Sequence, residues 1–285
     1  MATHQDNTHP PVSADPQASA PELRTEQLVK AFDSQVILDH IDLTINRKEI
    51  VAIVGASGSG KTVLLDCLIR LLDVSAGKVF AADHSSPRLP LIDITHASET
   101  VLHHIRLHWA VVFQRNALFS GSVYENIALL LREHTTMTEA QITERTRESL
   151  AASALDVDRI ITKDRDELSG GMAKRVAIAR AIAIDPAVLF YDEPTTGLDP
   201  IVSSTIQELI WNMHHKPTHT HEPRTTVIVT HDKELIRRLS PRILMLHQGK
   251  ICYDGDYQNF GQADCAPAAQ YLREMPVLHS RQTRD

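Results

Sequence analysis

Residues 49–62 read EIVAIVGASGSGKT, an apolar run followed by a loop of small residues that ends on a lysine and a threonine. The loop matches the phosphate-binding pattern G-x-x-x-x-G-K-[ST], in which the lysine adds positive charge and the threonine hydroxyl binds Mg²⁺. Its glycines let backbone N–H groups approach phosphate oxygens closely, and the helix expected next directs a positive dipole end at the same anion. We therefore predict a nucleotide site formed by Gly55, Ala56, Ser57, Gly58, Ser59, Gly60, Lys61 and Thr62.

The composition narrows the class of protein. A net charge of −7 argues against a chain that coats nucleic acid, so we expect no nucleic-acid partner. The three cysteines are too few and too scattered for a disulfide framework or a thiolate metal site, which fits a reducing compartment. No apolar stretch approaches the roughly 18 residues that span a bilayer, and the N-terminus lacks the apolar core of a signal peptide. We expect a soluble protein; if it serves a membrane, it does so through a partner.

The chain divides into three parts by residue type. Residues 1–22 are rich in Pro, Ala, Ser and His with almost no large apolar residue, which predicts a disordered leader. Residues 23–260 alternate strand-like and helix-like patterns, which predicts an α/β core with a parallel sheet. A mostly helical stretch, about 115–170, reads as a subdomain inserted into that core. Residues 261–285 are assigned to a C-terminal tail.

Two stretches carry no regular pattern. Residues 79–108 contain two prolines and many polar residues and are predicted to form a polar loop. Residues 214–224, HHKPTHTHEPR, carry four histidines, and imidazole is a common ligand of zinc and nickel. No carboxylate or thiolate set converges on this stretch in the sequence, so a surface loop is the simpler interpretation.

Two further motifs suit phosphate chemistry. The run AVLFYDE places Asp192 at the end of a buried strand, where it can hold Mg²⁺, and Glu193 directly after it. The run LSGGMAKRVAIARAIA, 168–183, places Ser169 as a helix N-cap and exposes the backbone N–H groups of Gly170 and Gly171. One bound nucleotide does not need a second helix N-terminus that is suited to an anion.

With these motifs the chain resembles the ATP-binding cassette (ABC) family over about residues 23–260, and LSGGM resembles the family signature. The resemblance implies a P-loop NTPase fold with a parallel-sheet core, an antiparallel β subdomain and an inserted helical subdomain. It also assigns Phe32 to the aromatic that stacks on adenine, Gln114 to the glutamine of the Q-loop, Asp199 in GLDP to the D-loop and His231 in VTHD to the switch histidine.

The resemblance also implies an assembly and a reaction. Two copies would pair head to tail, so that ATP lies between the phosphate loop of one and Ser169, Gly170 and Gly171 of the other. The expected chemistry is attack of water on the γ-phosphate. Glu193 would be the general base and His231 would contact the γ-phosphate. Gln114 would touch the Mg²⁺ and water network and the membrane partner.

A single cassette without a membrane span resembles the detachable ATPase subunit of a transporter. Such a subunit docks peripherally on an integral-membrane permease at the cytoplasmic face of the inner (plasma) membrane. The segment 116–134, NALFSGSVYENIALLLREH, and Met172 resemble the ATPase of the Mla and Mce lipid-transport systems, which implies phospholipid cargo and an Mce-type lipid-binding partner. An ATPase of an amino-acid or other small-solute importer and a soluble ATPase of iron–sulfur assembly remain open as alternatives.

Overall fold

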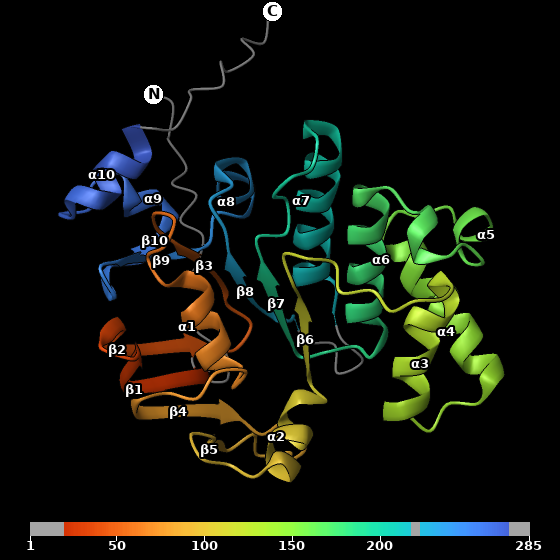
Figure 1. Cartoon of the computed structure of the whole chain (residues 1–285), viewed down its shortest axis with the longest axis horizontal. Coiled ribbons are helices and arrows are strands. Elements are labelled where there is room, and N and C mark those ends of the chain that lie inside the picture. Colours follow the sequence, from red (N-terminus) through yellow and green to blue (C-terminus); the bar gives the residue numbers. More distant parts are fainter. Residues whose placement is uncertain (1–19, 218–222, 274–285) are drawn as a thin grey trace, which may run out of the picture.

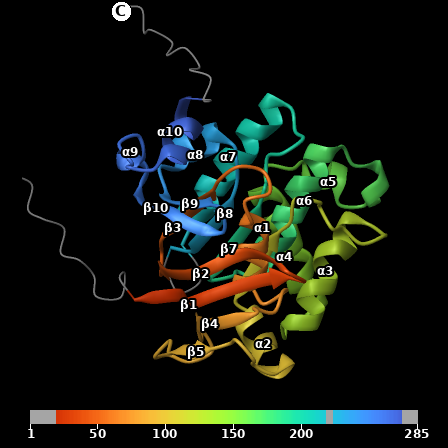
Figure 2. The ribbon, with the colours of Figure 1, turned by 60° about the vertical axis from the view of Figure 1, so that its left-hand side comes forward.

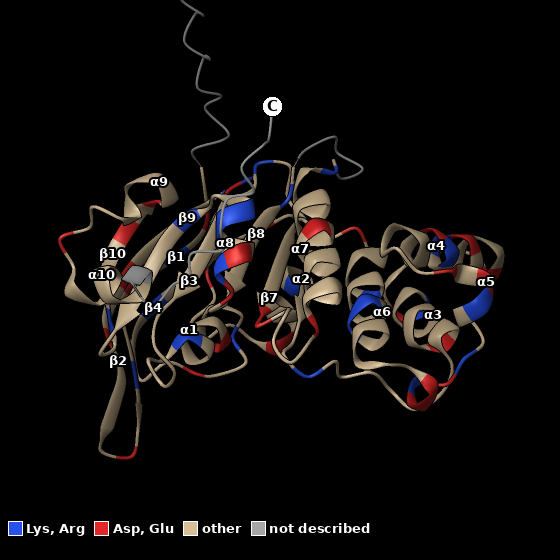
Figure 3. Cartoon of the chain, turned by 90° about the horizontal axis from the view of Figure 1, so that it is seen from above, with Lys and Arg blue, Asp and Glu red and all other residues tan. Residues whose placement is uncertain are grey.

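The computed structural model describes residues 20–217 and 223–273 of the 285-residue chain. These residues form two β-sheets and a group of helices, spread along an elongated molecule (Figure 1). The antiparallel sheet and the C-terminal helices lie at one end, and a helical subdomain lies at the other (Figure 3). Within the described ranges, every helix is too short or too polar to cross a bilayer.

The central sheet has six strands in the order β10-β9-β3-β8-β7-β6. All neighbours are parallel except β10, which pairs antiparallel with β9, so the parallel core predicted from the sequence is confirmed. Strands β7 and β8 are buried along their whole length, as expected for strands covered on both faces. The bounds are β3 Ile50–Val54, β6 Trp109–Val112, β7 Val188–Asp192, β8 Thr225–Val229, β9 Arg242–His247 and β10 Lys250–Asp256.

The second sheet has four strands in the order β2-β1-β4-β5, each antiparallel to its neighbour. It is the antiparallel subdomain that the family resemblance implies. Helix α1, Lys61–Leu68, lies between this sheet and the central one (Figure 2) and buries Leu64, Leu65 and Leu68 in a core shared by both. The bounds are β1 Pro21–Phe32, β2 Gln35–Asn46, β4 Ala76–Ala82 and β5 Leu91–Asp93.

Three helices cover the other face of the central sheet, namely α6 Gly170–Ala183, α7 Pro200–His215 and α8 Lys233–Leu239. Each begins where a side chain accepts a hydrogen bond from the first turn: Ser169 caps α6, Asp199 caps α7 and Asp232 caps α8. Their apolar sides form one cluster with β6, β7 and β8. Because Asp199 and Asp232 sit on the loops after β7 and β8, these two caps also fix where those loops lie.

The helical subdomain consists of α3 Val123–His134, α4 Glu139–Ala152, the short α5 Val157–Ile160 and the 3₁₀ turn η1 Arg165–Glu167. These elements fall within the range predicted to be helical. They pack on α6 through a separate apolar cluster (Figure 3). Helix α6 therefore belongs to two cores, one with the sheet and one with the subdomain.

The prediction of a polar loop over 79–108 is wrong. Strand β4 continues to Ala82, β5 follows, and α2, Glu99–Arg106, precedes β6. Strand β4 is hydrogen-bonded to β1, more than fifty residues earlier, and β5 pairs with β4. Strands β1 and β4 are distant in sequence, so local pattern did not reveal the sheet that β5 then extends.

The predicted boundaries at both ends of the chain also differ from the structure. Strand β1 begins at Pro21, inside the predicted leader, and Glu22 is buried against His84. The rest of that leader, 1–19, lies outside the described residues. The predicted tail contains α10, Ala266–Arg273, which follows α9, Tyr257–Phe260. Ala268 of α10 is buried with Phe260 in a cluster that includes α8 and β9, so this part of the tail is folded.

Candidate functional site

The phosphate loop follows β3 and has the backbone that its glycines predict. Gly55, Gly58 and Gly60 have φ angles of 151°, 77° and 97°, a region that side-chain-bearing residues rarely adopt. The Lys61 ammonium donates to the carbonyl oxygens of Gly55 and Ala56, both at 3.0 Å. Burial lowers the pKa of Lys61, and the neighbouring carboxylates at the end of β7 oppose that shift. The loop thus encloses a cation at the point where phosphate oxygens are expected.

The first residues of α1 face the end of β7. The Thr62 hydroxyl donates to a carboxylate oxygen of Asp192 at 3.2 Å, and Gln114 lines the cavity beside them. Burial raises the pKa of Asp192, and the hydrogen bond from Thr62 opposes that shift. A hydroxyl, a carboxylate and an amide oxygen are hard ligands of the kind that Mg²⁺ binds in proteins. The three residues predicted as metal ligands fit that ion.

The residue after Asp192 meets the loop after β8. His231 Nδ1 lies 2.8 Å from Glu193 Oε2, and the Thr196 hydroxyl donates to the same oxygen at 3.1 Å. Glu193 has a φ of 46°, in the left-handed region, which turns its side chain away from the line of the strand. Such backbone strain occurs often at functional sites. One carboxylate oxygen is thus held by two neighbours at the rim of the site.

These groups enclose one cavity of about 830 Å³. It brings together Phe32, most of the phosphate loop, Gln114, Glu193 and His231, as the sequence predicts. Four parallel strands of the central sheet end at the same edge. The phosphate loop follows β3, Gln114 follows β6, Asp192 ends β7 and His231 follows β8. This edge is where α/β folds bind ligands.

Sequence reasoning missed part of the lining. Tyr271 of α10 faces this cavity with its hydroxyl buried, although its segment was assigned to the tail. Burial raises the pKa of that phenol. Lys233, at the start of α8, also lines the cavity and lies 5.5 Å from the Tyr271 ring. No motif marks either residue, because their position depends on how α8 and α10 pack.

The signature residues lie apart from this cavity. Among the described residues that line it, Ser169, Gly170, Gly171 and Asp199 do not appear. The Ser169 hydroxyl accepts from the Met172 N–H at 3.3 Å and so caps α6. Asp199 accepts from two N–H groups at the start of α7 at 3.0 Å each. A single chain thus carries a phosphate site and, separately, a second helix N-terminus suited to an anion.

A buried network positions the loop that carries His231. The next residue, Asp232, accepts hydrogen bonds from the Thr195 hydroxyl at 2.7 Å and from the Gln207 amide at 2.9 Å. Thr195 lies just after Glu193, and Gln207 lies on α7. The contact between Glu193 and His231 is therefore supported from both loops.

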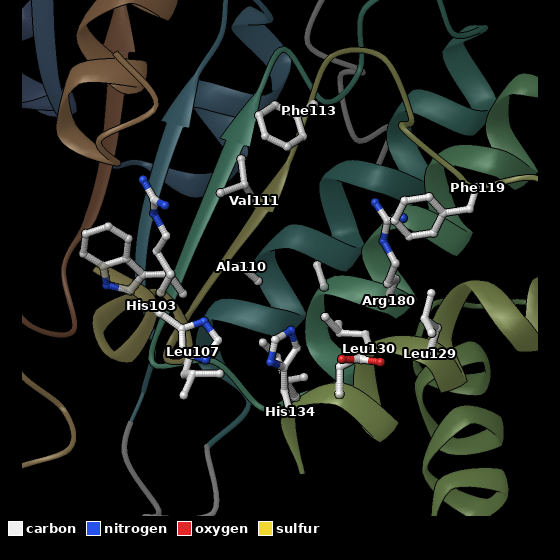
Figure 4. A pocket seen from close by; sticks show the side chains of 15 residues that line it. His103, Leu107, Ala110, Val111, Phe113, Phe119, Leu129, Leu130, His134 and Arg180 are labelled. Atoms are coloured by element: carbon white, nitrogen blue, oxygen red, sulfur yellow. The ribbon is translucent and has the colours of Figure 1, made fainter. Parts of the chain in front are cut away.

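A second cavity of about 480 Å³ lies between the central sheet, α2 and the helical subdomain (Figure 4). Its surface is mainly apolar, with Phe113, Phe119 and Leu129 among the lining residues. Charged and imidazole side chains complete the lining, namely His103, Arg106, Glu133, His134 and Arg180. This groove could not be predicted from the sequence, because α2 and the end of α3 meet only in the folded chain.

The histidine-rich stretch shows no metal cluster in its described part. His214 is buried, with Nδ1 at 3.0 Å from the Thr226 hydroxyl, and burial lowers its pKa to about 4. His215 stacks on Trp211. His219 and His221 lie outside the described residues.

Comparison with known proteins supports this geometry. A family model described as ABC transporter matches residues 38–196. The chain is 35% identical to Protein TRIGALACTOSYLDIACYLGLYCEROL 3, chloroplastic, of Arabidopsis thaliana, over 84% of this chain and 69% of the relative. It is 34% identical to a probable ribonucleotide transport ATP-binding protein, mkl, of Mycobacterium tuberculosis, over 86% of this chain and 64% of that protein, just under two thirds of its length. It is 33% identical to the histidine transport ATP-binding protein HisP of Pseudomonas aeruginosa, over 88% and 96% respectively.

Among solved structures, the ATP-binding cassette MJ0796, in a dimeric post-hydrolysis state bound to ADP and Pi, superposes with a TM-score of 0.70. The two chains are 27% identical, and the match covers 82% of this chain and 98% of the other. The chain therefore belongs to the ABC transporter family, in which it is an ATP-binding and ATP-hydrolysing domain, as its motifs predict.

Proposed function

We propose that this chain hydrolyses ATP at the carboxyl edge of its central sheet to power lipid transport through a separate permease, docked at the cytoplasmic face of the inner (plasma) membrane. The observation that carries the catalytic part is the contact of 2.8 Å between His231 and Glu193, inside the cavity of the phosphate loop. This contact supports a joint role of the carboxylate and the imidazole at the γ-phosphate.

In the proposed reaction a water oxygen attacks the γ-phosphorus while the bond to the leaving ADP oxygen breaks. Glu193 accepts the proton of that water, and His231 holds the Glu193 carboxylate and contacts the γ-phosphate. Lys61 and the loop N–H groups stabilise the negative charge on the phosphate oxygens. Phe32, which is 43% exposed at the cavity rim, offers its ring to adenine.

Mg²⁺ would be held by Thr62, Asp192 and Gln114, whose oxygen atoms fit it. When bound, this ion offsets charge on the β- and γ-phosphates. The contact between Thr62 and Asp192 keeps two of these ligands together in the fold itself. Removal of Mg²⁺ by a chelator should therefore abolish hydrolysis while leaving the fold intact.

The second helix N-terminus fits a head-to-tail pair of two copies. In such a pair Ser169, Gly170 and Gly171 of one copy would contact the ATP of the other, and Asp199 would lie at the interface. The separation of these residues from the cavity of their own chain supports this arrangement. The dimeric state described for MJ0796 supports it as well. ATP binds the closed pair more tightly than the open one, and hydrolysis removes that difference.

The apolar groove of Figure 4 is the proposed docking site for a short helix of the permease. Its floor would bury the apolar face of that helix, and Arg106 and Arg180 at its sides would meet acidic or carbonyl groups. Phe113, which lines the groove, directly precedes Gln114. Movement of the permease helix can therefore reach the nucleotide site through adjacent residues.

Lipid as cargo rests on Met172 and on the segment 116–134, where most of the resemblance to Mla and Mce ATPases lies. Five groove residues come from this segment: Phe119, Leu129, Leu130, Glu133 and His134. The part of the chain that carries the resemblance is thus the part that would contact the permease. The name of the Arabidopsis relative, which refers to a galactolipid, also supports lipid cargo. An Mce-type lipid-binding subunit is the further partner we propose.

The match to HisP favours one alternative, the ATPase of an amino-acid importer. Affinity purification through this subunit from membranes of its own cells, followed by mass spectrometry of proteins and lipids, separates the two. Recovery of a permease with an Mce-type subunit and phospholipid supports the proposal. Recovery of an amino-acid permease, or of soluble iron–sulfur assembly proteins alone, contradicts it.

A segment swap tests the groove itself. Residues 116–134 are replaced by the matching segment of an amino-acid importer ATPase, and a swap of α4, which does not line the groove, is the control. We expect the first swap to abolish retention by the permease while the free subunit still binds ATP, and the control to keep both. Equal retention of the two variants would show that the groove does not select the permease.

A further inference from the structure

One buried charge has no part in the motifs above. Lys174 lies on α6, one turn after the signature glycines, and is only 2% exposed. Burying an ammonium is costly unless it is hydrogen-bonded. Its Nζ donates to the carbonyl oxygens of Phe113 at 2.9 Å and of Gln114 at 2.8 Å. The charge is thus used to hold the backbone of the Q-loop.

The same loop is fastened at two further points. Arg180, also on α6, donates to the Ala117 carbonyl at 3.0 Å. Arg165, on η1, donates to the Leu118 carbonyl at 2.9 Å. The segment after β6 runs past α6 towards α3 (Figure 1). Three cations from the helical subdomain and α6 therefore bind its carbonyl groups, and Lys174 is the one that reaches Gln114.

Lys174 connects the Q-loop to the start of α6, and these two segments have different proposed functions. Gln114 belongs to the nucleotide cavity of its own chain, whereas the start of α6 would face the nucleotide of the second copy. Hydrogen bonds from a charged donor are stronger than hydrogen bonds between neutral groups. The two bonds from Lys174 therefore hold the Q-loop backbone firmly against α6. Phe113, bound by the same ammonium, also lines the permease groove.

We infer that Lys174 is a positioning residue that fixes Gln114 relative to the signature helix, so that turnover depends on it while ATP binding does not. Lys174 itself does not line the nucleotide cavity. The inference rests on the role proposed for Gln114. If the Lys174 donor is lost, we expect the unchanged Gln114 side chain to take a wrong position in the nucleotide cavity.

The test uses the full chain in its complex with the permease, with Lys174→Met removing the donor. We expect kcat to fall about 10- to 100-fold, the loss that corresponds to one hydrogen bond from a charged donor. Equilibrium binding of a fluorescent ATP analogue should stay within about twofold of wild type, since the phosphate loop is untouched. Lys174→Arg, which keeps a charged donor, should recover most of the kcat.

Arg145→Met is the matched control. Arg145 also donates to a backbone carbonyl of α6, that of Ala183 at 2.7 Å, but at the far end of the helix. Its kcat should remain within about threefold of wild type. Lys174→Gln keeps an uncharged donor and serves if the methionine variant fails to fold; its kcat should lie between those of wild type and the methionine variant.

A double variant separates positioning from general destabilisation. If Lys174 acts through Gln114, adding Lys174→Met to Gln114→Ala should lower kcat by less than about threefold further. Multiplicative losses, a wild-type kcat for Lys174→Met, or equal losses for the Arg, Gln and Met variants would each overturn the inference. Normal turnover of Gln114→Ala would instead show that the role proposed for Gln114 fails, and the inference would fall with it.

Discussion

The Lys61 ammonium contacts two carbonyl oxygens of its own loop, and a bound nucleotide would give it phosphate oxygens instead. Catalysis of phosphoryl transfer depends mostly on such positioned charge. We expect Lys61→Ala to lower the rate of ATP hydrolysis by about 100-fold or more, as measured by phosphate release from the purified complex.

The control is Lys78→Ala, which removes an exposed lysine paired with Asp93 on the antiparallel sheet. Its rate should equal that of the wild type, because the pair is far from the cavity and weak. Near-normal turnover of the Lys61 variant would mean that the phosphate loop has been assigned to the wrong residues.

At the scale of elements, the start of α6 packs closely on α7. A Cβ added at Gly171 would lie 2.5 Å from a methyl group of Val202, whereas one added at Gly170 would meet nothing closer than 4.0 Å. Gly171→Ala should therefore lower the free energy of unfolding by about 1–3 kcal/mol through overpacking. Gly170→Ala should be neutral or slightly stabilising, since alanine favours the helix.

Urea unfolding of both variants, monitored by circular dichroism, checks this difference without any need for activity. Equal midpoints for the two variants would show that α6 can shift away from α7 at little cost.

The end of α7 contains a group that should make stability depend on pH. The buried His214 has a pKa lowered to about 4, well below the value of about 6.5 for an exposed histidine. As pH falls below 6.5, the unfolded chain takes up a proton that the folded chain does not, so stability decreases down to about pH 4. The loss from this one group should approach about 3 kcal/mol.

His214→Asn removes this titration, so its loss of stability between pH 7.5 and pH 5 should be smaller than that of the wild type. His215→Asn, at the exposed neighbouring position, should lose as much as the wild type. Thermal melts at both pH values provide the measurement. Parallel losses in all three proteins would mean that His214 is protonated in the folded state.

At the scale of the whole molecule, one chain carries the phosphate-loop cavity and, apart from it, the signature residues Ser169, Gly170 and Gly171. This separation predicts a dimer held together by ATP. Glu193→Gln keeps the shape of the side chain but cannot accept a proton from water. We expect this variant to bind ATP, to lose nearly all turnover, and to elute mostly as a dimer with Mg-ATP in size-exclusion chromatography with light scattering. Glu208→Gln, at an exposed position of α7, is the matched control.

Wild-type protein and the Glu208 variant should elute mainly as monomers under the same conditions, because hydrolysis opens the pair. A monomeric profile and unchanged hydrolysis for the Glu193 variant would remove this residue from the role of general base.

The family, the parallel core and many of the residues that line the nucleotide cavity could be predicted from the sequence alone. The phosphate loop, Asp192 and Glu193, and the motifs of Gln114 and His231 could be predicted because each is a short run of residues beside a strand or helix with a clear period. In such runs the local backbone sets the side-chain position, so the chemistry follows from spacing.

The features outside these motifs became visible in the folded chain. Several features depend on partners far apart in the chain: the pairing of β4 with β1, the groove between α2 and α3, the place of Tyr271 and the hydrogen bonds from Lys174 to the Q-loop. Lys174 lies sixty residues from Gln114, and its pattern on α6 is that of any polar helix residue. Strand pairing and the burial of a charge are set by the whole fold, because their free energy depends on neighbours that no local window contains.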